Sequence, residues 1–139
     1  MSKVAVVFWS GTGNTEQMAK AVAEGAQEAG AEVKVLGPSG FSAGDVASYD
    51  AIAFGCPAMG AEVLEEDEFE PMFTAVEGSL SGKKIGLFGS WGWGDGAWME
   101  DWKSRCDTDG ANVISTVICQ DAPDEAALAE CKALGTALA

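Results

Sequence analysis

The chain has 139 residues, 47% of them hydrophobic, which suits one domain with a packed core. Its 22 acidic and 8 basic residues give a net charge of −14, and we expect such a surface to repel nucleic acid and anionic membranes. There is no histidine, and the four cysteines form no CxxC pair. This composition argues against zinc and iron–sulfur sites, excludes a histidine-dependent triad, and predicts that the cysteines are reduced thiols of the core.

Five short apolar runs alternate with helical patterns along the chain. The runs, which we interpret as strands, are residues 3–9, 32–36, 51–55, 84–89 and 112–119. The helical patterns are residues 16–29, a short one at 43–47, and then 67–76, 97–108 and 124–138. In the first helix, Met18, Val22, Ala26 and Ala29 share one face. The alternation predicts one α/β domain over residues 1–139, a parallel sheet buried on both faces by helices.

The turn at residues 10–15, Ser-Gly-Thr-Gly-Asn-Thr, lies between the first strand and the first helix. Its glycines allow the backbone to wrap closely around an anion, and the free N–H groups of the first helical turn favour negative charge. Ser10, Thr12, Thr15 and Asn14 add neutral donors. The turn lacks the lysine of a Walker A loop and the third glycine of a dinucleotide fingerprint. It predicts a phosphate cradle, with a turn that binds nothing as the alternative.

Two further loops follow strand ends and are expected to meet this cradle, because ligands of open parallel sheets bind at the carboxyl ends of the strands. One is residues 56–62 and the other is residues 90–96. Met59 and Trp93 would hold a flat aromatic ring between them, with Trp91 nearby. Local packing is the alternative for Trp91 and Trp93, whereas we expect a core position for the tryptophans of the helix at 97–108.

Three motifs, at residues 9–15, 55–60 and 87–96, each at its own strand end, make the whole chain resemble the flavodoxins. The last strand, 112–119, has no insertion, which is typical of the short-chain type. The resemblance implies a flavodoxin-like three-layer fold with strand order 2-1-3-4-5 and one bound FMN. It also implies a low-potential one-electron carrier that shuttles electrons between redox proteins, rather than an enzyme.

The resemblance places the FMN phosphate on Ser10, Thr12, Asn14 and Thr15 with the N–H groups of Gly11 and Gly13, and the flavin ring between Met59 and Trp93. Glu62 would accept from flavin N3–H, and Trp91 stands where a tyrosine is usual. The full set of cofactor-binding residues that it implies is Trp9, Ser10, Gly11, Thr12, Gly13, Asn14, Thr15, Pro57, Ala58, Met59, Gly60, Ala61, Glu62, Ser90, Trp91, Gly92, Trp93, Gly94 and Gln120.

Two other functions remain open at this point. A small FMN-dependent reductase of the quinone or nitro-group type could use the same fold, although 139 residues leave little chain for a substrate pocket. A phosphate-binding receiver domain without flavin is the third hypothesis, and the absence of an acidic cluster after the first strand argues against it. We expect no metal ion and no catalytic residue of the chain's own.

Carboxylates gather around the predicted site, and we expect them to dock basic faces of reductases and electron acceptors. The first group is Glu62, Glu65, Glu66, Asp67, Glu68 and Glu70. The others are Asp95, Glu100 and Asp101, and Asp121, Asp124 and Glu125. Without a signal peptide or an apolar run long enough to cross a membrane, the chain is expected to be a cytoplasmic monomer.

Overall fold

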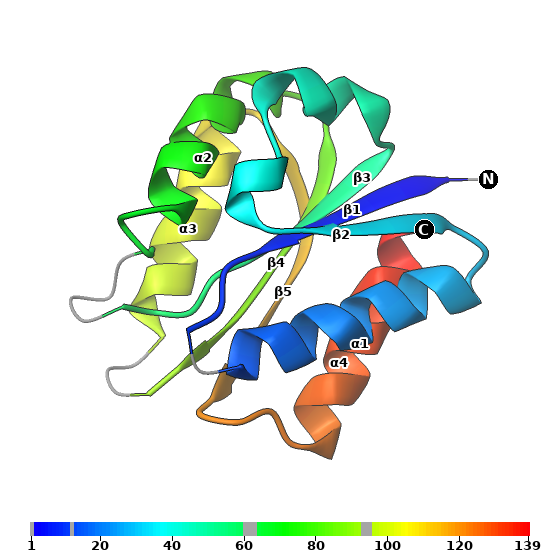
Figure 1. Cartoon of the computed structure of the whole chain (residues 1–139), viewed down its shortest axis with the longest axis vertical. Helices are drawn as coiled ribbons and strands as arrows, with labels where there is room; N and C mark the ends of the chain where they lie inside the picture. The colour runs from blue at the N-terminus through cyan, green and yellow to red at the C-terminus, as the bar shows by residue number, and fades with distance from the viewer. Residues whose placement is uncertain (1, 12, 60–63, 93–95) are drawn as a thin grey trace.

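A five-stranded parallel sheet in the order β2-β1-β3-β4-β5 forms the centre of the molecule (Figure 1). The structure is a computed structural model, which describes residues 2–11, 13–59, 64–92 and 96–139. The strands are β1 (Lys3–Phe8), β2 (Glu32–Leu36), β3 (Ala51–Gly55), β4 (Lys84–Trp91) and β5 (Asn112–Gln120). The predicted strand order is confirmed, and β4 extends two residues further than the sequence pattern indicated.

Among the described residues, the α-helices are α1 (Asn14–Glu28) between β1 and β2, α2 (Phe69–Val76) between β3 and β4, α3 (Ala97–Thr108) between β4 and β5, and α4 (Glu125–Leu138) after β5. Short 3₁₀ helices cover Pro38–Gly40, Ala43–Ser48 and Glu77–Ser79. Helix α1 begins earlier than predicted because Gly13 turns the chain in the left-handed conformation, with φ of 95°. None of the helices within the described ranges is long and apolar enough to cross a membrane.

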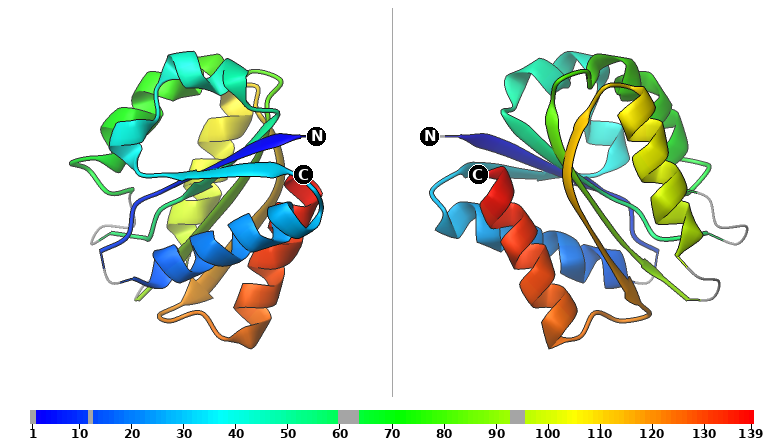
Figure 2. Two further views of the ribbon diagram at one scale, coloured as in Figure 1. Left: turned by 45° about the vertical axis from the view of Figure 1, so that its right-hand side comes forward. Right: turned by 180° about the vertical axis from the view of Figure 1, so that it is seen from behind.

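The helices cover the two faces of the sheet in pairs, with α1 and α4 on one face and α2 and α3 on the other (Figures 1 and 2). Side chains of a strand alternate between faces, so Val4 and Val6 pack under α1 and α4 while Ala5 and Val7 pack under α2 and α3. All four are fully buried. The sheet is therefore buried on both sides, as the continuous apolar runs predicted.

Two details of the predicted core change in the structure. Ala29 was expected on the buried face of the first helix, but it is exposed, because α1 ends at Glu28 and the chain leaves the sheet there. Cys119 is only half-buried on the edge strand β5, whereas the other three cysteines are buried as predicted, and all four are free thiols. Trp98 and Trp102 lie in the core, as expected.

Candidate functional site

A cavity of about 240 Å³ opens where the chain leaves the strands of the sheet. Segments that follow β1 and β3, the end of β4 and the residue after β5 form its walls. Nine of its lining residues belong to the predicted set: Trp9, Gly11, Asn14, Pro57, Ala58, Met59, Ser90, Trp91 and Gly92. The tenth is Asp121. The three predicted loops thus converge at the carboxyl edge, as parallel topology requires.

The turn after β1 forms a cradle at the N-terminus of α1. The N–H of Gly13 donates to Ser10 Oγ at 3.0 Å, and no side chain among the described residues caps the helix. Thr15 is 1% exposed, and its hydroxyl has no hydrogen-bond partner among the described residues. A buried hydroxyl without a partner is costly, unless a ligand completes its hydrogen bonding. The free N–H groups and this hydroxyl are the donor set that fits a phosphate group.

Backbone hydrogen bonds fix the segment that leaves β3. The N–H of Cys56 donates to the carbonyl of Phe88 at 3.1 Å, and the N–H of Ala58 donates to that of Ser90 at 3.0 Å. The indole N–H of Trp98 donates to the Cys56 carbonyl at 3.2 Å. These bonds place Pro57, Ala58 and Met59 half-buried along the cavity. The apolar wall they form with the tryptophans suits the face of a flat aromatic ring.

The ends of β4 and β5 are joined beside the cavity. The N–H of Asp121 donates to the Trp91 carbonyl at 2.7 Å, and Gln120 Nε2 donates to the Gly92 carbonyl at 3.4 Å. The Gln120 side chain is therefore bonded to the backbone of Gly92, which lines the cavity, but Gln120 itself does not line it. Asp121 has φ of 55°, a left-handed conformation that aspartate tolerates better than most residues. The sequence predicts Asp121 only as one of the acids that dock basic partners, and not as a residue of the cavity.

Trp9 connects the cavity to the start of α2. It lies just beyond β1, and its indole N–H donates to the Glu68 carboxylate at 2.6 Å. Its ring also lies so close to Gly11 that a Cβ there would be 3.0 Å from Trp9 Cη2. The sequence suggested Trp9 as a neighbour of the cradle but gave no indication of this bond, which joins segments far apart in the chain.

Glu65 does not belong to an exposed docking surface, and that prediction is wrong. Its side chain is 5% exposed, and its carboxylate accepts the N–H groups of Asp67, Glu68 and Phe69 at 2.7–2.8 Å. Burial by itself raises the pKa of Glu65, but these three donors outweigh it and hold the pKa below the usual range. Glu65 therefore caps the start of α2, where free N–H groups and the helix dipole favour a carboxylate.

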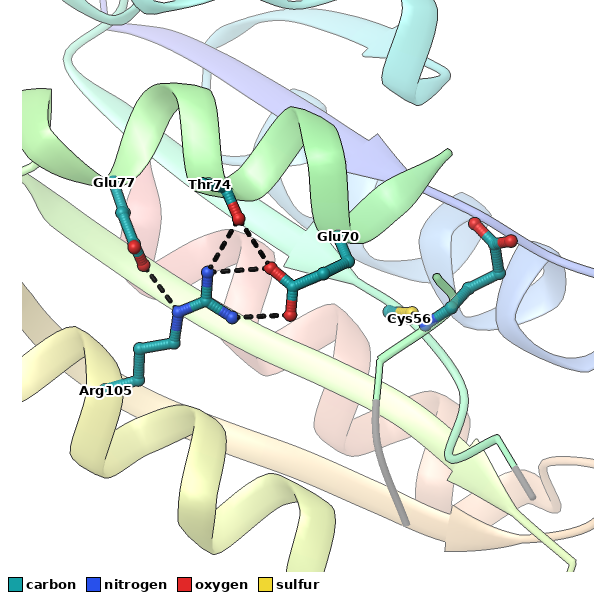
Figure 3. Close-up of polar contacts among 6 residues, drawn as sticks. Cys56, Glu70, Thr74, Glu77 and Arg105 are labelled. Carbon is teal, nitrogen blue, oxygen red and sulfur yellow. Dashed lines mark hydrogen bonds and ion pairs between the residues drawn. The ribbon is translucent and has the colours of Figure 1, made fainter. Parts of the chain in front are cut away.

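Glu70, another predicted docking acid, is bound to α3 (Figure 3). Arg105 donates to both of its carboxylate oxygens at 2.8 Å and to Glu77 through Nε. The Arg105 guanidinium lies 4.9 Å from the centre of the Phe73 ring and holds the pKa of Glu70 below its usual range. The bidentate geometry joins α2 to α3, so this acid has a structural role in an ion pair between the two helices.

We expect Glu65→Gln to lower the free energy of unfolding at pH 7 by about 1–2 kcal/mol, because an amide cannot accept all three N–H bonds as a carboxylate does. The pKa of Glu65 is depressed in the folded state, so its stabilisation is present above its ordinary pKa and is lost as the pH falls through the folded value. Urea unfolding at several pH values should therefore show a flatter acid limb in the variant. Glu66→Gln, at an exposed neighbour, should change stability by less than about 0.5 kcal/mol; equal losses in both variants would contradict the capping role.

Six of the predicted cofactor-binding residues lie outside the described part of the chain. They are Thr12, Gly60, Ala61, Glu62, Trp93 and Gly94. Their assignments remain predictions.

The flavodoxin family model matches residues 6–135. The flavodoxin of Megasphaera elsdenii is 51% identical over 136 residues, which cover 98% of each chain, and that of Clostridium beijerinckii is 48% identical over 122 residues, 87% of this chain and 88% of the relative. The solution structure of two-electron reduced Megasphaera elsdenii flavodoxin superposes with a TM-score of 0.90 at 50% identity and covers 97% of both chains. The chain therefore belongs to the flavodoxin family of flavin-binding electron-transfer proteins.

Proposed function

We propose that the protein binds one FMN and carries single electrons between redox partner proteins at low potential. The observation that carries the proposal is the cradle at the α1 N-terminus, where the buried Thr15 hydroxyl has no partner among the described residues. It adjoins a cavity with walls of Trp9, Met59 and Trp91. A phosphate anchor next to an aromatic wall matches the two ends of FMN. When bound, the flavin supplies the redox chemistry, and the chain supplies orientation and electrostatics.

The residues divide the work of holding the cofactor. Ser10, Asn14 and Thr15, with the open helix N-terminus, would take the phosphate with neutral donors. Met59 would lie on one side of the ring, with Trp93 proposed for the other side and Glu62 for flavin N3–H. The FMN-dependent reductase is the alternative, and it predicts turnover with NAD(P)H and a quinone or nitro compound.

Negative charge around the cavity would lower the reduction potential of the bound flavin. Among the described residues that line the cavity, Asp121 is the one with an ionisable side chain, and the whole chain carries a net charge of −14. A second electron would add negative charge to a ring that is partly shielded from water, and nearby carboxylates disfavour that charge. We therefore expect Asp121→Asn to raise the second one-electron potential without changing FMN content, as measured by a spectroelectrochemical titration. An unchanged potential would contradict a role for this carboxylate.

The purified protein should bind FMN more tightly than riboflavin, because only FMN fills the phosphate cradle. Fluorescence titration of the apoprotein measures both affinities, and equal values would contradict the cradle.

Steady-state assays with NAD(P)H and quinones test the alternative function, since rapid turnover by the isolated protein would identify a reductase. A carrier should instead transfer electrons only between added redox proteins.

We also propose that basic partners dock at the acids near the start of α2. Glu65 and Glu70 are engaged internally. Among the described residues of this segment, the exposed acids are Glu66, Asp67 and Glu68, of which Glu68 also accepts the indole N–H of Trp9. Such carboxylates would speed encounters with a basic partner in short-lived contacts that salt weakens.

The docking proposal predicts that charge reversal at Glu66 and Asp67 slows electron transfer from a basic reductase at low salt by about tenfold, within the range of electrostatic steering. Stopped-flow rates at increasing ionic strength measure the effect, and FMN content should not change. Charge reversal at Glu32 of β2 and Glu130 of α4, two other exposed acids, is the control with the same change in net charge. Equal effects of both reversals would mean that net charge alone, rather than this surface, governs association.

A further inference from the structure

The thiol of Cys56 joins two parts of the chain that border the cavity. Cys56 follows β3 directly and is fully buried. Its Sγ accepts the N–H of Glu65 at 3.3 Å and lies 3.6 Å from the carbonyl oxygen of Pro57, to which the thiol donates. One side chain thus contacts the residue that begins the segment after β3 and the residue that caps α2.

This contact joins the exit of β3 to the residues just before α2. On one side, Pro57, Ala58 and Met59 line the cavity. On the other side, the Glu65 carboxylate accepts the N–H groups of Glu68 and of Phe69, the first residue of α2. The backbone carbonyl of Cys56 is held in turn by the indole of Trp98. The thiol therefore lies between Pro57 of the cavity wall and Glu65, which caps α2.

The Glu65 N–H is a buried donor, and Cys56 Sγ is the acceptor that the structure gives it. Burial raises the pKa of the Cys56 thiol to about 12, so it remains protonated and can accept and donate at once. Alanine would leave the Glu65 N–H without an acceptor, which is costly in a buried position. The contact between the exit of β3 and the start of α2 would then be lost.

We propose that Cys56 is a positioning residue for the flavin, whose thiol ties the exit of β3 to the start of α2 and so holds Pro57, Ala58 and Met59 at the cavity wall. This inference rests on the proposed FMN site. It assigns no reaction to the thiol, which acts through the residues it positions.

Cys106 provides a matched control. It is fully buried in the same core cluster as Cys56, and burial likewise raises its pKa to about 12. It lies in α3, and its thiol makes no hydrogen bond within the described ranges. Cys106→Ala and Cys56→Ala remove the same atom from similar surroundings, so any difference between them reports the hydrogen bonds of Cys56.

The test compares Cys56→Ala, Cys56→Ser and Cys106→Ala with the unmodified protein in three measurements. Hydrogen exchange of the Glu65 amide in the apoprotein should accelerate at least tenfold in Cys56→Ala and little in Cys106→Ala. FMN binding, from fluorescence titration, should weaken about tenfold in Cys56→Ala, which corresponds to about 1.4 kcal/mol. The first one-electron potential should shift in Cys56→Ala, while Cys56→Ser, which keeps a hydrogen-bonding group, restores part of each loss.

Equal changes in Cys56→Ala and Cys106→Ala, in exchange, affinity and potential, would show that Cys56 only fills the core. If the unmodified protein does not bind FMN, the proposed function fails, and Glu65 exchange still decides whether the thiol joins the exit of β3 to the start of α2. If FMN binds and the Glu65 amide exchanges equally in all variants, the positioning role fails while the proposed function stands.

Discussion

Gly135→Ala should lower the free energy of unfolding by about 2–3 kcal/mol, the largest stability loss we expect from a single added methyl group. Gly135 lies in α4 where that helix crosses α1, and an added Cβ would collide with the backbone carbonyl of Val22. Gly25 makes the reciprocal approach, because its Cβ would collide with the carbonyl of Lys132. A backbone carbonyl inside a helix cannot move aside, so the two helices must separate.

Urea unfolding of the apoprotein measures the loss. Gly78→Ala is the control, because Gly78 is exposed, no heavy atom lies within 4 Å of its added Cβ, and it has no positive φ. Its stability should stay the same or rise by a few tenths of a kcal/mol, since alanine reduces the entropy of the unfolded chain. A Gly135→Ala protein as stable as Gly78→Ala would mean that the helices do not pack as closely as described.

Thr15→Val should weaken FMN binding about 10- to 100-fold and leave the folding of the apoprotein intact. Valine matches threonine in shape but lacks the hydroxyl, and a hydrogen bond to a charged group contributes about 1.5–3 kcal/mol. In the apoprotein the Thr15 hydroxyl is buried without a partner among the described residues, so its removal should not destabilise the fold. The FMN affinity should therefore fall while the free energy of unfolding of the apoprotein does not.

Riboflavin and a second variant test whether the effect comes from the phosphate. Riboflavin affinity should not change in Thr15→Val, because riboflavin has no phosphate, and Thr15→Ser should retain most of the FMN affinity. An equal loss for riboflavin and FMN would locate the effect in the packing of α1 rather than in the cradle.

The sequence by itself determined the layout of the sheet and the position of the cradle. Apolar runs such as residues 51–55 leave no polar face, so a strand covered on both sides follows from the pattern. Glycines and hydroxyls at residues 10–15 have a local meaning, because the conformation of a turn and the free N–H groups of a helix start depend on neighbours in the chain. The turn and the buried Thr15 at the start of α1 therefore lie where the sequence predicts them, and phosphate binding there stays a prediction.

Only the tertiary structure decided which acids are free and which side chains support the site. Glu65, Glu66 and Glu70 are alike in the sequence, yet one caps α2, one is exposed and one binds Arg105 across two helices. The contact of Cys56 with the Glu65 N–H depends on where the start of α2 lies relative to the end of β3. Such roles arise from partners distant in sequence, and a local pattern contains no information about which buried donor or charge will meet a given side chain.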